Sequence, residues 1–175
     1  DGERKIQSRM GLSASAEYVD EFLKEISTIW KKENTEYRYQ GKKVDAVLVD
    51  EAQFLSEAEI DTLSDLVDFY NIPVICYGLR TDFRNRLFPG SRRLMEIADV
   101  IEEVPTVCWC GKRAQCNTRY ANGEIVREGA QIMLGSNESY VALCRKHYKE
   151  GKLWKEAGAE NETSTRRNCK IMEKE

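Results

Sequence analysis

The sequence predicts an α/β fold with a parallel sheet, followed by a small domain built around a metal ion. The first observation is the apolar run from Ala46 to Val49, which is short, β-branched and unbroken, like a strand buried on both faces of a parallel sheet. The second is a helical pattern after this run, which leads into another short apolar run at 74–77. The third is that four of the six cysteines lie between residues 108 and 144.

Composition limits the classes of protein to consider. The 175 residues are 41% hydrophobic and 33% charged, which suits one folded domain with a small addition. The formal net charge of −3 gives no reason to expect a nucleic-acid or membrane partner. No apolar run approaches the roughly 20 residues that span a bilayer, and the polar first residues do not resemble a signal peptide. Clustered cysteines without a secretory signal favour a cytoplasmic protein with metal ligands or free thiols.

The first 43 residues are expected to contain one helix. Apolar residues recur at helical spacing from Glu17 to about Trp30, which predicts an amphipathic helix. Residues 1–15 are polar and predict a loop, and residues 31–43 predict a charged, solvated connector.

A strand–helix–strand unit is predicted next. The first strand covers residues 44–49 and the second covers 74–77. Between them, Ser56 followed three residues later by Glu59 predicts a capping box at the start of a helix that ends at 71–73. Such a unit is expected to be parallel and right-handed. Beyond it, residues 91–99 predict a short helix and residues 100–104 another strand.

Two acids follow the first strand directly. Asp50 and Glu51 lie at its carboxyl end, where open α/β sheets bind their ligands. Adjacent strand residues point to opposite faces, so we expect the two carboxylates to have different tasks. The alternative is that they begin a solvated loop, and the pattern alone does not separate the two interpretations.

The loop at 79–90 leaves the carboxyl end of the second strand, beside the end of the first. It carries three arginines and two phenylalanines, a combination that could stack a flat ring and hold an anion. The alternative is that Phe83 and Phe88 only pack the loop onto the core.

The cysteine-rich segment predicts a metal site. Cys108 and Cys110 form one ligand pair, and Cys144 and His147, the only histidine, form another about 33 residues later. Four protein ligands of thiolate and imidazole type predict structural, tetrahedral zinc. The alternative is a set of unrelated buried thiols and a surface histidine. The intervening segment 111–143 predicts a long strap pinned at its base, with a hairpin turn at Asn122-Gly123.

Five motifs together carry a family resemblance. They are Val-Leu-Val-Asp-Glu-Ala-Gln-Phe-Leu (47–55), Tyr-Gly-Leu-Arg-Thr-Asp-Phe-Arg (77–84), Cys-Trp-Cys-Gly (108–111), Gly-Ser-Asn-Glu-Ser-Tyr (135–140) and Cys-Arg-Lys-His (144–147). In this order and spacing they resemble type II thymidine kinase, most closely its enterobacterial form. The resemblance extends from about Lys5 to Tyr148 without large gaps.

The resemblance implies a RecA-like P-loop parallel sheet flanked by helices, plus a small zinc-binding domain with a lasso loop. Residues 1–104 would form the kinase domain and 105–149 the zinc and lasso domain. Beyond the resemblance, the Lys/Glu-rich composition of 150–175 predicts a charged, disordered tail. The implied reaction is transfer of the γ-phosphate of ATP, with magnesium, to the 5′-hydroxyl of thymidine, a salvage step for DNA synthesis. The resemblance also implies a homotetramer and inhibition by thymidine triphosphate.

The resemblance assigns roles to matching positions. Glu51 matches the catalytic base and Asp50 the magnesium-associated acid, acting through water. Arg84 is a weaker match to a phosphate contact. The residues that match the nucleoside pocket are Phe54, Leu79, Phe83, Phe88, Asn117, Gln131, Met133 and Tyr140, and the zinc ligands are Cys108, Cys110, Cys144 and His147.

One element of the family is missing from the sequence. The glycine-rich phosphate loop, Gly-x-x-x-x-Gly-Lys-Ser/Thr, has no match, and in the family it lies upstream of the segment that matches residues 5–15. The resemblance therefore predicts a native protein that extends further at its N-terminus, or else a non-catalytic remnant. Two other functions remain open, a different RecA-like ATPase whose acids activate water, and a zinc-ribbon binding module. The acidic net charge disfavours nucleic-acid binding by such a ribbon.

Overall fold

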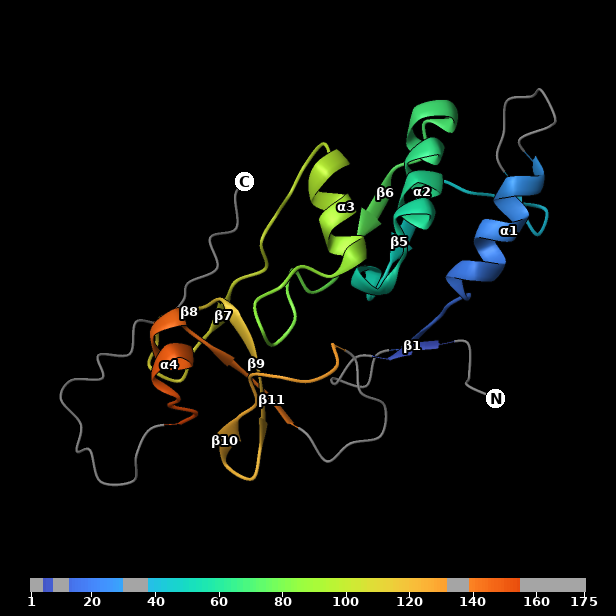
Figure 1. The fold of residues 1–175 in the computed structure, drawn as a ribbon. Helices are drawn as coiled ribbons and strands as arrows, with labels where there is room; N and C mark the ends of the chain where they lie inside the picture. Colours follow the sequence, from blue (N-terminus) through green and yellow to red (C-terminus); the bar gives the residue numbers. More distant parts are fainter. Residues whose placement is uncertain (1–4, 8–12, 30–37, 132–138, 155–175) are drawn as a thin grey trace, which may run out of the picture. The chain divides into compact units, whose positions relative to one another are not determined.

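The computed structural model describes residues 5–7, 13–29, 38–131 and 139–154, which are drawn in colour in Figure 1. They form two compact units. The first unit contains the described residues of 1–104 and of 127–135. The second contains the described residues of 105–126 and of 136–175.

The predicted strand–helix–strand unit is confirmed and lies at the centre of the first unit (Figure 1). Strands β5 (Val47–Val49) and β6 (Val74–Cys76) are parallel, with Leu48 opposite Ile75. Helix α2 (Glu57–Tyr70) connects them. It begins at the predicted capping box, in which the Ser56 hydroxyl accepts a hydrogen bond from the Glu59 amide and the Glu59 carboxylate accepts one from the Ser56 amide.

The core of the first unit lies on one face of this strand pair. Val49 packs in a buried cluster with Leu63 and Leu66 of α2 and Leu23 of α1 (Val19–Ile29). The other face differs from the expectation of burial on both sides, because Leu48 is 63% exposed and Ile75 opposite it is 46% exposed. The reason is that the described parallel sheet has only two strands, and its described helices cover the Val49 side.

Two polar segments that predicted loops contain short antiparallel pairs. Strand β1 (Lys5–Gln7) pairs with β2 (Ser13–Ser15), and β3 (Arg38–Tyr39) pairs with β4 (Lys42–Lys43). Their pairing comes from backbone hydrogen bonds, which an apolar-periodicity argument does not detect. Residues Gln40 and Gly41 connect β3 and β4 with φ values of 48° and 77°, the left-handed conformation that a tight hairpin turn requires.

The prediction for residues 91–104 is half right. Helix α3 (Pro89–Ile97) confirms the short helix, beginning two residues early with proline at its first position. The strand expected at 100–104 is not formed, and Val100 and Val104 are 74% and 79% exposed. No described strand pairs with this segment, so its β-branched residues have no ladder to join.

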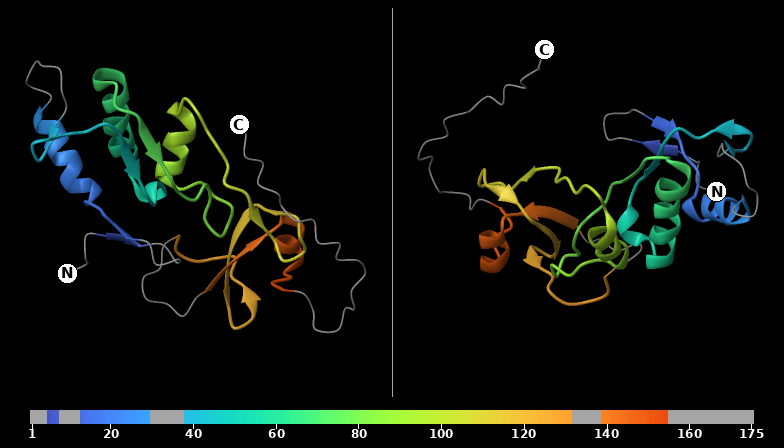
Figure 2. Two further views of the ribbon diagram at one scale, coloured as in Figure 1. Left: turned by 180° about the vertical axis from the view of Figure 1, so that it is seen from behind. Right: turned by 90° about the horizontal axis from the view of Figure 1, so that it is seen from above.

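The second unit is organised around β9 (Cys116–Ala121). This strand lies between β10 (Glu124–Ile125) and β11 (Ser139–Leu143) in an antiparallel sheet, gold to orange in Figure 2. The predicted Asn122-Gly123 turn joins β9 to β10, with φ values of 51° and 80°. A second pair, β7 (Thr106–Val107) with β8 (Arg113–Ala114), and the helix α4 (Arg145–Glu150) complete the unit.

Within the described residues, no helix has the length and apolar character needed to cross a membrane.

The start of α3 is held against a short 3₁₀ helix, η1 (Ala52–Phe54), which follows β5. Gly90 makes this approach possible. A Cβ atom at Gly90 would lie 2.5 Å from the carbonyl oxygen of Ala52 and 2.7 Å from that of Leu55. These are backbone atoms, which cannot rotate away, so the packing of α3 on η1 requires glycine at this position.

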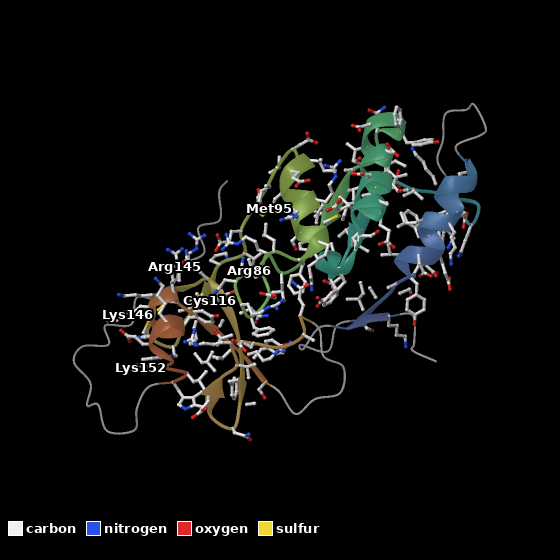
Figure 3. The ribbon with its side chains drawn as sticks, viewed as in Figure 1. Arg86, Met95, Cys116, Arg145, Lys146 and Lys152 are labelled. Atoms are coloured by element: carbon white, nitrogen blue, oxygen red, sulfur yellow. The ribbon has the colours of Figure 1, made fainter. Side chains whose placement is uncertain are left out.

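We predict that Gly90→Ala destabilises the protein by about 1–3 kcal/mol, because the added methyl group must push two backbone segments apart. Urea unfolding followed by circular dichroism measures the effect. The matched control is Met95→Ala on the same helix (Figure 3), whose side chain is 46% exposed and whose loss should change stability by about 0.5 kcal/mol or less. Equal stability of the two variants would contradict the predicted contact.

Candidate active site and metal centre

Asp50 and Glu51 occupy a sharp turn immediately after β5. Glu51 has φ 53° and ψ 33°, a left-handed conformation that is uncommon for a residue other than glycine and that often marks functional sites. The amide of Glu51 donates a 2.9 Å hydrogen bond to the Asp50 carboxylate. Because β5 ends at Val49, this turn rather than strand alternation sets where the two acids point. Both residues are exposed.

The turn is fastened to the end of β6 by backbone hydrogen bonds. The Tyr77 amide donates to the Val49 carbonyl at 2.8 Å, and the Ala52 amide donates to the Tyr77 carbonyl at 2.9 Å. The carboxyl ends of the two parallel strands therefore lie together, as expected for a ligand-binding edge.

Gln53 connects Glu51 to the loop after β6. Its side chain is 1% exposed, its amide nitrogen donates a hydrogen bond to the Glu51 carboxylate, and its amide oxygen accepts one of 3.0 Å from the Leu79 backbone. A Cβ atom at Gly78 would lie 2.5 Å from this amide oxygen. Sequence reasoning missed Gln53. The available signal was one amide side chain between the apolar residues Ala52 and Phe54.

The predicted aromatic residues of the first unit divide by exposure. Phe83 and Phe88 are buried, at 1% and 4% exposure, whereas Phe54 and Leu79 are 52% and 42% exposed. The Phe54 ring meets the Phe88 ring edge to face, with centroids 5.6 Å apart. Phe83 and Phe88 thus anchor the loop through their buried rings. Phe54 and Leu79 offer exposed apolar surface that a flat ring could contact.

Asp82, which sequence reasoning did not select, is the one acid of the loop at 79–90, and several groups donate hydrogen bonds to its carboxylate. It is 1% exposed, and its carboxylate accepts hydrogen bonds from the Arg84 amide (2.8 Å), the Arg84 guanidinium (2.8 and 3.0 Å), the Arg86 amide (2.9 Å) and the Gln131 side chain (3.2 Å). Burial alone would raise the pKa of Asp82, but the hydrogen bonds from Arg86 and Arg84 outweigh it and hold this pKa below its ordinary value.

This arrangement changes the interpretation of Arg84. Its guanidinium is bonded to the buried Asp82 carboxylate, and a further nitrogen donates to the Gly129 carbonyl at 3.3 Å. The same group lies 5.4 Å from the centroid of the Phe83 ring. A guanidinium held in this way braces the loop. The phosphate contact that the resemblance suggested for Arg84 stays a prediction.

Two of the predicted pocket residues belong to the second unit. Asn117 lies on β9, and Tyr140 lies on β11 directly opposite Arg119. Arg119 is fully buried, and its Nε donates a 2.9 Å hydrogen bond to the Tyr140 hydroxyl. Its guanidinium carbon also lies 5.6 Å from the centroid of the Tyr140 ring, so this arginine fixes the tyrosine from one side. Met133 lies outside the described residues.

The four predicted metal ligands come together in the second unit. The ligand atoms of Cys108, Cys110, Cys144 and His147 all lie within 4.8 Å of one another. The Cys108 sulfur is 3.4 Å from Nδ1 of His147, and the Cys110 sulfur is 4.0 Å from that of Cys144. This is the donor set and number of a closed tetrahedral site. Cys116, on β9 in Figure 3, lies outside this group, as expected.

Backbone hydrogen bonds form a tight turn around the first ligand pair, Cys108 and Cys110. The Cys108 amide donates to the Lys112 carbonyl, and Gly111, with φ 82°, donates to the Cys108 carbonyl, both at 2.8 Å. Burial would raise the pKa of Cys108, but hydrogen bonds from the Cys110 and Cys144 amides and from His147 lower this pKa to about 6. The lowered pKa favours the thiolate form of Cys108, which is the form that binds metal.

The Trp109 ring covers the histidine ligand. It stacks on His147 with ring centroids 4.1 Å apart and an interplanar angle of 3°. Its indole N–H donates to the Lys152 carbonyl at 3.3 Å, which anchors the ring. The stack fixes the orientation of the imidazole, as residues around a metal site commonly do for its ligands.

Comparison with known proteins points to one family. The sequence model of the family described as thymidine kinase matches residues 1–148. The chain is 48% identical over 150 residues to a thymidine kinase of Haemophilus influenzae, a match that covers 85% of this chain and 75% of that protein. It is 45% identical over 150 residues to a thymidine kinase of Pasteurella multocida (85% and 75% covered) and 42% identical over 147 residues to one of Colwellia psychrerythraea (83% and 73%).

The lowered pKa of Asp82 predicts a pH-dependent contribution to stability. A carboxylate whose pKa is depressed by folding stabilises the protein fully above its ordinary value of about 3.9, and this stabilisation is lost as the pH falls through the depressed value. Asp82→Asn should therefore cost about 1–3 kcal/mol at pH 7, and this cost should shrink only below about pH 4.

Urea unfolding of wild type and variant at a series of pH values measures this difference. Asp61→Asn is the control, because it also removes an aspartate paired with an arginine (Arg93 Nε to Asp61 at 2.7 Å), but an exposed one. It should have an effect below about 1 kcal/mol. An Asp82→Asn variant as stable as wild type at pH 7 would show that the Asp82 carboxylate does not stabilise the fold.

Proposed function

Because this chain belongs to the thymidine kinase family, we propose that it transfers the γ-phosphate of ATP to the 5′-hydroxyl of thymidine, a salvage step that supplies DNA synthesis. The observation that carries this proposal is the match of residues 1–148 to the family, together with an acidic turn at the carboxyl ends of two parallel strands.

Glu51 is the residue we assign as general base. Phosphoryl transfer depends mainly on positioning and charge stabilisation, so one carboxylate beside the attacking hydroxyl is sufficient for the proton transfer. The Glu51 carboxylate is exposed at the end of β5 and is steered by the buried Gln53 amide. It would accept the proton of the 5′-hydroxyl as the oxygen attacks phosphorus in line.

Asp50 would hold magnesium through water. Its exposed carboxylate at the end of β5 is a hard oxygen donor of the kind that magnesium prefers. Magnesium bound with ATP neutralises charge that develops on the phosphates. In this mechanism Asp50 would keep the magnesium ion close to Glu51. The hydrogen bond from the Glu51 amide to the Asp50 carboxylate supports this role, because it keeps the two acids together.

The residues of the nucleoside pocket are assigned from the family resemblance. In the first unit, Phe54 and Leu79 supply exposed apolar surface, Phe83 and Phe88 support it, and Gln131 lies at the adjoining segment. Asn117 and Tyr140, which belong to the second unit, also match pocket positions of the family, as does Met133, which lies outside the described residues. These roles rest on the motif matches described above.

We propose zinc as the metal of the Cys108, Cys110, Cys144 and His147 group. Three thiolates and one imidazole suit zinc, and four protein ligands leave no open position for catalysis. The second unit has a small core of its own, to which Cys108, Cys116, Cys144 and Leu143 belong. Zinc would therefore contribute folding free energy to this unit.

Several finer features are proposals that rest on the family. They are a RecA-like sheet larger than the described strand pair, a kinase domain at 1–104, a zinc and lasso domain at 105–149, and a charged tail at 150–175. A homotetramer, feedback inhibition by thymidine triphosphate and a cytoplasmic location complete the proposal. A RecA-like ATPase would share the Asp50-Glu51 pair, so the assay below includes ATP hydrolysis.

The test is ATP-dependent phosphorylation of thymidine, measured beside deoxycytidine and deoxyadenosine. It is made with this chain and with the same chain preceded by a glycine-rich phosphate-loop segment. We expect the extended protein to phosphorylate thymidine in preference to the other two nucleosides. ATP hydrolysis by the extended protein without nucleoside phosphorylation would replace the kinase proposal with the ATPase.

Glu51→Gln tests the general base. In the active protein we expect a loss of turnover of roughly 100-fold or more with thymidine affinity kept, because the amide has the shape of the acid but cannot accept the proton. Turnover and calorimetric binding measure the two effects. Glu57→Gln, an exposed acid in the first turn of α2, is the control and should keep full turnover. Turnover retained in Glu51→Gln would remove Glu51 from this role.

Metal analysis tests the zinc proposal. The purified wild-type protein should contain roughly one zinc per chain, and Cys144→Ala with His147→Ala should contain none, because two ligands cannot hold the ion against solvent. Cys116→Ala is the control, since Cys116 lies in the same unit but outside the ligand group. A wild-type protein that folds and holds no zinc would overturn the proposal.

A further inference from the structure

The loop after β6 is closed around Asp82. The Asp82 amide donates to the Arg86 carbonyl at 2.9 Å, and the Asn85 amide donates to the Asp82 carbonyl at 3.0 Å. Asn85 has a φ of 59°, so the chain reverses direction here, and Thr81 and Leu87 form a bridge across the reversal. The loop between Leu79 and Phe88 is therefore closed by its own backbone hydrogen bonds.

The Asp82 carboxylate also reaches a distant part of the sequence. The Gln131 side chain, 49 positions further along the chain, donates to it at 3.2 Å. A second bond runs in parallel, because the arginine that Asp82 orients donates to the Gly129 carbonyl at 3.3 Å. Residues 129–131 are thus attached to the loop at two points, and both depend on one carboxylate that is 1% exposed.

We propose that Asp82 is a positioning residue for thymidine binding. Its carboxylate holds the loop between Leu79 and Phe88 and the segment at 129–131 in one fixed arrangement. This inference rests on the proposed function, which assigns Leu79, Phe83, Phe88 and Gln131 to the nucleoside pocket. Asp82 acts through these residues and needs no contact with the nucleoside itself.

The physical reason is the strength of a buried, charge-assisted hydrogen bond. Such bonds contribute more than neutral ones, and a buried carboxylate with several donors fixes each donor in place. If the segment at 129–131 were free to leave the loop, only part of the molecules would have the arrangement that binds thymidine. The apparent affinity would then fall in proportion to that fraction.

The experiment reverses the polarity of the Asp82–Gln131 bond. Gln131→Glu keeps the shape of the side chain but places a second carboxylate against Asp82, so it should weaken thymidine binding roughly tenfold or more. Asp82→Asn should also weaken binding, because the carboxylate that holds both Gln131 and Arg84 is lost. In the double variant the amide introduced at position 82 can donate to the carboxylate introduced at position 131, which removes the repulsion between two carboxylates. The double variant should therefore lose less binding free energy than Asp82→Asn and Gln131→Glu lose together.

Isothermal titration calorimetry with thymidine measures affinity in this chain. Hydrogen exchange of the backbone amides of 127–131, without thymidine, gives an independent measure of the attachment. Exchange should be faster in each single variant, and the increase in the double variant should be smaller than the two single increases together. Asp61→Asn, in wild type and in Gln131→Glu, is the matched control and should change neither measurement, because its pair with Arg93 lies between α3 and α2.

The outcomes separate this inference from the proposed function. A wild-type chain that does not bind thymidine would count against the proposed function, and the exchange measurement would still decide whether Asp82 holds the segment. Losses in the double variant that are smaller than the two single losses together support the inference, since a Gln131 side chain that only contacts thymidine would act independently of position 82. Additive losses in both measurements would overturn it.

Discussion

The backbone hydrogen bonds between the ends of β5 and β6 determine the geometry of the acidic turn and of everything attached to it. They bring the carbonyl of Val49, the amide of Ala52 and both backbone groups of Tyr77 into one short ladder. With that ladder in place, Glu51 adopts its left-handed conformation and Gln53 points inward between Glu51 and Leu79. Two parallel strands are enough to do this, because the ligand-binding edge needs only their carboxyl ends.

The two units use different means to hold their functional residues. The first unit relies on an apolar core beneath the strand pair and on buried polar side chains, Gln53 and Asp82, that connect one loop to another. The second unit is small, and a ligand group of three cysteines and a histidine lies at its core. A small unit buries little apolar surface, so cross-linking by a cation is an effective substitute for a larger core.

Local patterns in the sequence predicted several elements of the fold and the metal-ligand group. The capping box at Ser56, the turn at Asn122-Gly123 and the four metal ligands are each encoded within a few residues, and the structure places them as expected. Features that depend on partners distant in sequence were not predictable in this way. Gln53 and Asp82 look like ordinary polar residues until the fold shows what they bond, and the strand expected at 100–104 fails because a ladder also needs a partner.

The two close-approach glycines also bear on how this enzyme could be redesigned. Gly78 and Gly90 stand at the two ends of the loop that carries Leu79, and both lie against the turn at 52–55. The two ends of the loop therefore do not tolerate added atoms, whereas the exposed positions between them do. Engineering that aims to accept other nucleosides can diversify residues such as Leu79 and Arg80 and should leave both glycines unchanged.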